Sequence, residues 1–112
     1  MNKMIETILE VNSERMCLFK IGSFYHCFGK DAYILSYIFN YKIKEIGSNH
    51  KDCGFPIGVL PKIKAKLENI GISYIVIDSR NNYYVDEQFD NGNNNKYQTM
   101  YSKAKRTVNY KI

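Results

Sequence analysis

The fold is decided by a short stretch near the N-terminus, MCLFKIGSFYHCF, which spans residues 16–28. Two apolar segments, Met16–Ile21 and Phe24–Phe28, flank the dipeptide Gly22-Ser23. A glycine followed by a small polar residue is typical of a type II′ turn, because this turn needs a positive φ at its first central position. The stretch therefore predicts a β-hairpin, with Phe24 immediately after the turn.

The segments on either side of the hairpin predict two helices and a short strand. Residues 1–13 carry apolar side chains at helical spacing, with acidic residues on the other face. After the hairpin, Asp31 is a candidate N-cap for a helix that continues to residue 39. Residues 40–46 predict a short strand, and the polar residues 47–54 predict a loop.

The second half of the chain predicts two more strands around a third helix. Phe55–Val59 predicts a short strand or an extended entry into that helix. Pro61 suits the first turn of a helix, where its missing N–H is not needed, and Gly71 is a typical residue to end one. The near-continuous apolar run in Ile72–Asp78 is typical of a central strand buried on both faces, with Tyr83–Phe89 as its partner.

The C-terminal part combines an Asn-rich linker, Asp90–Asn95, with a basic amphipathic helix over residues 96–108. Such a helix is ordered either by docking on the domain or by a partner. Together the elements predict an α/β fold in residues 1–90, with a mixed β-sheet flanked by helices. The linker and the basic helix then form a separate segment, residues 91–112.

The positive charge of the chain is concentrated at its C-terminus. The formal net charge is +5, and residues 96–112 contain five Lys or Arg and no acidic residue. A local basic segment suits a phosphate backbone as partner. The alternative is a C-terminal tail that is exposed to solvent and only keeps the protein soluble, since such a tail has the same composition.

Length and composition narrow the class of protein. The chain has 112 residues, the length of one ordinary domain, and 45% of them are hydrophobic. Three cysteines without regular spacing favour buried free thiols and the reducing cytoplasm over a disulfide framework. No apolar run approaches the roughly 20 residues of a membrane span, and residues 1–10 are too polar for a secretory signal.

Motifs of catalysis and metal binding are absent or weak. The chain has neither G-x-x-x-x-G-K-[ST] nor G-x-G-x-x-G, so we expect no ATP use and no cofactor. A conceivable zinc set comprises His26, Cys27, His50 and Cys53, but a loop histidine and core cysteines account for these residues better. We therefore expect no metal.

Acidic residues near predicted strand ends leave one enzymatic alternative open. Asp78, Asp86, Glu87 and Asp90 are candidates to hold magnesium in a small metal-dependent nuclease. Acids at strand ends and in loops are more often solvated surface residues, and no paired spacing such as E-x-K follows the central strand. We therefore keep the nuclease as a second alternative.

The hairpin resembles the N-terminal domain of the MutS mismatch-repair family. LFKIGSFYHCF at residues 18–28, followed by Asp31-Ala32, is similar to the family pattern L-F-x-x-G-D-F-Y-E-x-F-x-x-D-A. A second stretch, FPIGVLP at residues 55–61, resembles the family's P-M-A-G-V-P. A helix, a glycine and a strand follow it in family order. The two matches together cover most of residues 1–80.

The resemblance implies nucleic-acid binding by an aromatic wedge. In the family, the Phe at the position of Phe24 inserts at a mispaired base from the minor groove, and the duplex kinks. A Glu two residues later hydrogen-bonds the base, but this chain has His26 there, and it has Ser23 where the family has Asp. The resemblance therefore implies contact with nucleic acid and looser reading of mismatches, with Tyr25 as a further stacking ring.

We therefore expect a non-enzymatic binding module for mismatched DNA or an RNA–DNA heteroduplex. The chain ends where the family would continue, so it resembles small free-standing relatives that accompany reverse transcriptases of diversity-generating retroelements. An adaptor that docks on a larger nucleic-acid enzyme is the first alternative. The expected nucleic-acid-binding residues are Phe24, Tyr25, His26, Lys20, Lys103, Lys105 and Arg106.

Overall fold

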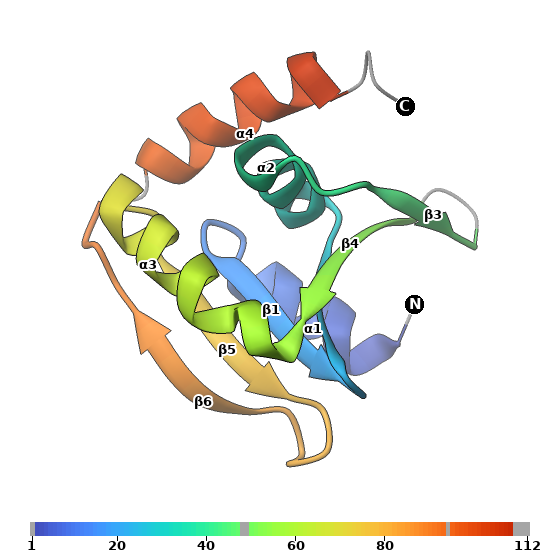
Figure 1. Ribbon diagram of the computed structural model, residues 1–112. Helices are drawn as coiled ribbons and strands as arrows, with labels where there is room; N and C mark the ends of the chain where they lie inside the picture. Colours follow the sequence, from blue (N-terminus) through green and yellow to red (C-terminus); the bar gives the residue numbers. More distant parts are fainter. Residues whose placement is uncertain (1, 48–49, 94, 109–112) are drawn as a thin grey trace.

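A six-stranded mixed β-sheet forms the centre of the computed structural model, which describes residues 2–47, 50–93 and 95–108 (Figure 1). The strand order is β3-β4-β2-β1-β5-β6. Strands β1 and β5 pair in parallel, and every other neighbouring pair is antiparallel. The elements in chain order are α1 (Lys3–Val11), β1 (Met16–Ile21), β2 (Phe24–Phe28), α2 (Lys30–Phe39), β3 (Lys44–Ile46), β4 (His50–Pro56), a 3-10 helix (Ile57–Val59), α3 (Leu60–Ile70), β5 (Tyr74–Asp78), β6 (Tyr84–Phe89) and α4 (Asn95–Val108). The α/β fold expected from the sequence is therefore confirmed.

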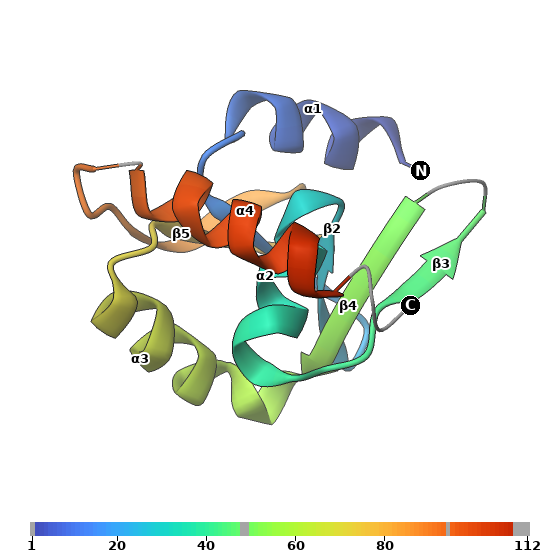
Figure 2. The same cartoon turned by 90° about the horizontal axis from the view of Figure 1, so that it is seen from above.

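Helices cover the two faces of the sheet unequally. Helix α1 lies on one face and α3 on the other (Figure 2). The larger core cluster contains buried side chains of α2, α3 and α4, including Leu35 and Leu67. The smaller cluster lies under α1 and contains Ile5, Phe19 and Phe28. On the same side of the sheet as Phe28, Phe24 is exposed and His26 is half-buried.

The predicted hairpin and the third helix are confirmed. Ile21 pairs with Phe24 across the turn, and Gly22 has φ 66°, the positive value that a type II′ turn requires at this position. Helix α3 has a proline in its first turn and ends at Gly71, whose φ is 93°. The central strand β5 is buried along four of its five residues, as its apolar run predicts.

The loop predicted over residues 47–54 is wrong from His50 onward. Strand β4 occupies His50–Pro56 and lies between β3 and β2 in the sheet. Cys53 and Phe55 alternate with more exposed residues and are each 1% exposed. The alternation of buried and exposed side chains that is typical of a strand is therefore present. The polar residues before Cys53 conceal this alternation in the sequence. The strand predicted over residues 40–46 is limited to the three residues of β3.

The N-cap role predicted for Asp31 is also wrong. The N-cap of helix α2 lies two residues earlier, at Gly29, whose φ is 61°, and Ala32 N–H donates to the carbonyl of Gly29. Asp31 is 2% exposed and accepts a hydrogen bond of 3.0 Å from the backbone N–H of Cys17. A buried carboxylate thus connects α2 to the start of β1.

Helix α4 packs on the rest of the molecule. Tyr97, Ala104 and Val108 are buried within the larger core cluster, so the helix is ordered by docking. The boundary expected between residues 90 and 91 stays a prediction. Cys17, Cys27 and Cys53 are buried free thiols, as expected. No helix formed by the described residues is long and apolar enough to span a membrane.

Candidate nucleic-acid interface

Phe24 lies at the tip of the β1–β2 hairpin and is 43% exposed. The turn before Phe24 is bonded to the start of the 3-10 helix, because Ile57 N–H donates a 3.1 Å hydrogen bond to the carbonyl of Ser23. Its cross-strand neighbours are Ile21, which is 37% exposed, and Pro56. An aromatic ring is therefore presented from a rigid hairpin among apolar neighbours.

Strand alternation places Phe24 and Tyr25 on opposite faces of the sheet. Tyr25 is 6% exposed and stacks on Phe55, with 5.5 Å between the ring centroids. Burial is the main cause that raises the pKa of its phenol. Tyr25 is thus a core residue and does not provide the second stacking ring expected from the sequence.

His26 shares the open face with Phe24 and is held by three neighbours. Its Nδ1 lies 2.9 Å from Asp52 Oδ1 and 3.1 Å from Asp52 Oδ2. Its ring is nearly parallel to that of Phe28, with an angle of 7° and 5.9 Å between the centroids. The Phe24 ring lies 6.5 Å away on the other side. His26 is therefore oriented by packing and by a carboxylate, with part of its ring exposed.

A pocket of about 250 Å³ opens beside Phe24 and His26. Its other lining residues come from β4 and from the segment before and within β3; they are Tyr41, Lys42, Lys44, Asp52 and Gly54. Sequence reasoning did not assign these residues to the site. The available signal was the polarity alternation of residues 40–46, which predicts that Lys42 and Lys44 project to the same side.

Lys20 lies away from this pocket. It is half-buried, pairs with Tyr25 in β2 and with Asp78 in β5, and by alternation points to the opposite face from Phe24. Its charge contributes to lowering the pKa of Asp78, after the larger effect of the backbone hydrogen bond from Arg80. The structure therefore does not bring Lys20 together with the aromatic tip.

The basic residues of α4 lie at the other end of the sheet. Lys103, Lys105 and Arg106 are all exposed. Helix α4 crosses the end at which β1 begins, whereas Phe24 lies where β1 ends (Figure 1). The predicted binding residues thus fall into separate groups on the structure. Lys111, another basic residue of the C-terminal segment, lies outside the described residues.

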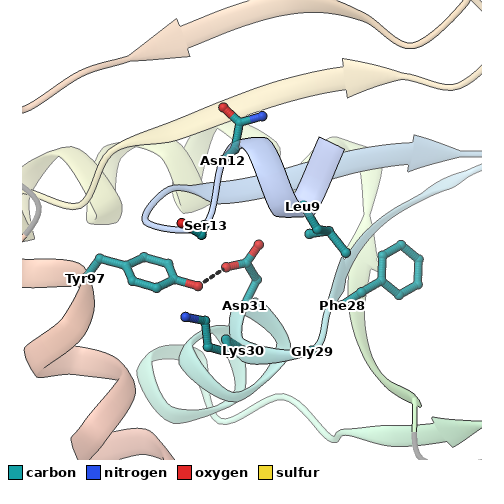
Figure 3. Close-up of a pocket in the computed structure, with 8 residues that line it drawn as sticks. All are labelled: Leu9, Asn12, Ser13, Phe28, Gly29, Lys30, Asp31 and Tyr97. Atoms are coloured by element: carbon teal, nitrogen blue, oxygen red, sulfur yellow. Dashed lines mark hydrogen bonds between the residues drawn. The ribbon is translucent and has the colours of Figure 1, made fainter. Parts of the chain in front are cut away.

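A buried polar connection fixes α4 in this position (Figure 3). Tyr97 Oη donates a 2.5 Å hydrogen bond to Asp31 Oδ1 at a pocket of about 220 Å³. Burial raises the pKa of Asp31 to about 7, although the hydrogen bond from Tyr97 partly opposes the shift. Lys30 lies over the ring of Tyr97, with Nζ 5.6 Å from its centroid. These contacts are structural, since they join α2, α4 and β1.

Several residues considered for metal chemistry have other roles in the structure. Cys27 and Cys53 are buried in the larger core cluster, on the opposite side of β2 from His26. Glu87 forms an ion pair with Lys64. Within the described ranges, no group of three or more His, Cys, Asp or Glu is placed to hold a metal ion.

Comparisons of the sequence with known proteins find one family and several similar proteins. The sequence model of the family described as MutS domain I matches residues 1–110. The DNA mismatch repair protein MutS of Prochlorococcus marinus, from strains AS9601 and MIT 9301, is 36% identical over 55 residues. Each match covers 49% of this chain and 6% of the relative. The chain is thus similar to a small part of proteins that are much longer.

Proposed function

Because the chain belongs to the MutS domain I family, and this domain is the mismatch-binding domain of MutS, we propose that the chain binds nucleic acid. The proposed binding surface is the face of the sheet that carries Phe24 and His26. We further propose that the chain catalyses no reaction. The observation that carries the proposal is Phe24, exposed by 43% at the tip of a rigid hairpin beside His26. The preferred ligand is a duplex that is mismatched or otherwise distorted, either DNA or an RNA–DNA hybrid.

The physical basis is the cost of separating stacked bases. An apolar wedge that enters between base steps unstacks them at a cost of a few kcal/mol, and the kinked duplex then makes further contacts with the protein. A mismatch or a bulge lowers that cost, since its bases are already poorly stacked. Phe24 therefore favours distorted over regular duplex without reading a particular base.

The departure at position 26 changes what the site reads. A glutamate would place a carboxylate at this position, but His26 places an imidazole there, whose Nδ1 lies 2.9 Å from Oδ1 of Asp52 in β4. An imidazole edge does not repel phosphate as an isolated carboxylate does. We propose that the site tolerates a range of mismatches and distortions.

The finer role in our proposal is that of an accessory to a reverse transcriptase of a diversity-generating retroelement, acting in the cytoplasm. It follows from the proposed binding of distorted duplexes, among them the RNA–DNA hybrid that such an enzyme makes. Binding of the purified chain to a purified reverse transcriptase, or to the RNA–DNA hybrid that such an enzyme makes, tests this role. No binding to either would contradict it.

A second candidate function is an adaptor that docks on a larger nucleic-acid enzyme. The observation that favours it is the position of Lys103, Lys105 and Arg106, which are exposed on α4 far along the sheet from Phe24. Such a surface suits an acidic partner. The adaptor predicts no affinity for isolated nucleic acid.

Duplex binding separates the two functions. Fluorescence anisotropy compares labelled duplexes of equal length that are matched, contain one mismatch or contain one extra base, at several salt concentrations. The proposed function predicts tighter binding to the distorted duplexes and a negative dependence of log affinity on log salt. Equal binding to all three duplexes would contradict the wedge, and no binding at low salt would favour the adaptor.

A further inference from the structure

A groove of about 580 Å³ lies between the last turn of α2 and the exposed side of α3. Both helices lie on the side of the sheet opposite α1 (Figure 2). This side is also opposite Phe24, because α3 packs in one core cluster with Tyr25. The groove is therefore separate from the proposed nucleic-acid interface. Its lining residues are Ile38, Phe39, Lys62, Ala65, Lys66 and Asn69.

The wall that α2 forms is apolar and fixed in position. Ile38 and Phe39 are half-buried and pack against the larger core cluster. The Phe39 ring stacks on Tyr41, with 5.7 Å between the centroids and an angle of 15°. Ser36 Oγ donates a 2.6 Å hydrogen bond to the carbonyl of Tyr41, so the segment that follows the helix is held as well. A wall that is already ordered loses little conformational entropy when a partner binds.

The wall that α3 forms has the spacing of a helical docking surface. Lys62, Ala65, Lys66 and Asn69 recur at i, i+3, i+4 and i+7, so they lie on one side of the helix, and all four are exposed. Because Ala65 is small, the backbone of another helix can approach this wall closely. Walls so open would not enclose a small molecule, whose sites bury most of the ligand. The shape therefore favours a helix that lies along the groove.

The charges that line the groove are all positive. They are those of Lys62 and Lys66, and neither residue forms an ion pair within the part of the chain that the structure describes. Lys64, which lies between them in the sequence, is paired with Glu87 at 2.5 Å. A helix with acidic residues beside its apolar stripe would complement this groove, whereas a helix with basic residues would be repelled.

We propose that the groove between α2 and α3 binds an amphipathic helix of a partner protein, with the apolar stripe of that helix against Ile38, Phe39 and Ala65 and its acidic side chains on Lys62 and Lys66. The inference goes beyond the proposed function, because it adds a protein-binding surface on the other side of the sheet. It does not depend on nucleic-acid binding, and one molecule can hold a duplex and a partner at the same time.

Two synthetic peptides test the charge and the shape of the groove. Each has about 18 residues, roughly five helical turns, with Leu at the spacing of one helical stripe. The acidic peptide carries Glu beside this stripe, and the basic peptide carries Lys at the same positions. Fluorescence anisotropy of the labelled peptides measures their binding to the full chain. We expect the acidic peptide to bind and the basic peptide not to bind. No binding of the acidic peptide, or equal binding of both, would overturn the inference.

Charge reversal shows where the acidic peptide binds. Lys62→Glu with Lys66→Glu should weaken its binding at least about tenfold, because like charges would then face each other. The same variant should bind the basic peptide instead. The control is Lys3→Glu with Lys96→Glu, which makes an equal change in net charge at exposed positions in the first turns of α1 and α4. An equal loss in both variants would mean attraction by net charge alone and would overturn the groove.

A substitution at Ala65 tests the apolar contact without a change in charge. Ala65→Gln adds a longer side chain at an exposed position, where glutamine is tolerated in a helix, and crowds the groove. We expect the affinity for the acidic peptide to fall about fivefold or more. Thr99→Gln, an exposed position on α4, is the control and should bind as the parent does. Circular dichroism verifies that both variants are folded. Unchanged binding by Ala65→Gln would place the peptide elsewhere.

Other occupants of the groove give different results with the same charge-reversal variant, Lys62→Glu with Lys66→Glu. If the groove holds phosphates, this variant has a less steep slope of log affinity against log salt concentration for duplex binding. If the groove holds a second copy of the chain, light scattering finds a parent dimer that the variant dissociates. We expect an unchanged slope and a monomeric parent, and either of the other results would overturn the inference. If Phe24→Ala binds duplexes like the parent while the acidic peptide still binds the groove, the proposed function is wrong and this inference stands.

Discussion

Tyr97 donates a hydrogen bond of 2.5 Å to Asp31 although the two residues are 66 positions apart. Asp31 in turn accepts from the backbone N–H of Cys17. One buried carboxylate therefore joins α2, α4 and the first residues of β1. Phe24 lies at the other end of β1, opposite Ile21.

Removal of the Tyr97 hydroxyl should destabilise the protein. Tyr97→Phe leaves one oxygen of Asp31 buried without its donor, and an unsatisfied buried polar group costs about 1–3 kcal/mol. Urea denaturation followed by circular dichroism measures the free energy of unfolding. The control is Tyr101→Phe, which keeps the edge contact of its ring with Tyr33. A decrease in stability no larger for Tyr97→Phe than for the control would contradict a structural role of the hydrogen bond.

The raised pKa of Asp31 predicts that stability depends on pH near neutrality. The ordinary pKa of an aspartate side chain is 3.8, and that of Asp31 in the folded chain is about 7, because the carboxyl group is buried. The folded state binds this proton more tightly than the unfolded state does, so the contribution of Asp31 is complete below the unfolded pKa and is lost as pH rises through about 7.

The measurement for Asp31 is a difference between two pH profiles. Unfolding free energies of the parent chain and of Asp31→Asn are compared from about pH 5 to about pH 8.5, an interval that brackets the raised pKa. Contributions that the two chains share cancel in the difference. We expect the parent to lose more stability than the variant over this interval. Parallel profiles would mean that Asp31 does not titrate there.

The basic surface of α4 is tested without removing the helix. Truncation after Asn95 would expose the core that Tyr97, Ala104 and Val108 cover, so it would not isolate the charge. Replacing Lys103, Lys105 and Arg106 with Gln leaves the buried side of α4 intact. If these residues bind phosphates, the slope of log affinity against log salt concentration becomes less steep. The change is about 0.9 for each phosphate contact that is lost. An unchanged slope would assign α4 to a protein partner or to no partner.

Local signals in the sequence were sufficient for several elements. The Gly22-Ser23 turn, the central strand β5 and the two ends of α3 follow from rules that act over a few residues. Strand β4 was missed because its first residues, starting at His50, are polar. Their hydrogen-bonding partners lie in β2 and β3, which no local pattern reveals.

The candidate site was predictable only in part for the same reason. The exposure of Phe24 follows from its place after the turn, and the period of two in a strand was enough to show that Tyr25 faces the other side. The contact between His26 and Asp52 joins residues 26 positions apart and depends on the β2–β4 register. Likewise, the burial of Asp31 depends on where α4 packs.

The most direct test of the wedge is the binding of Phe24→Ala to matched and mismatched duplexes of equal length, with Tyr84→Ala as the control. Tyr84 is an aromatic residue on β6 at the far edge of the sheet and is 64% exposed. Stacking of a base on an aromatic ring is worth roughly 1–3 kcal/mol, so Phe24→Ala should lose at least about fivefold in affinity for the mismatched duplex. Its affinity for the matched duplex should change little, and Tyr84→Ala should bind both as the parent does. A Phe24→Ala variant that keeps the parent's preference for the mismatched duplex would contradict the account.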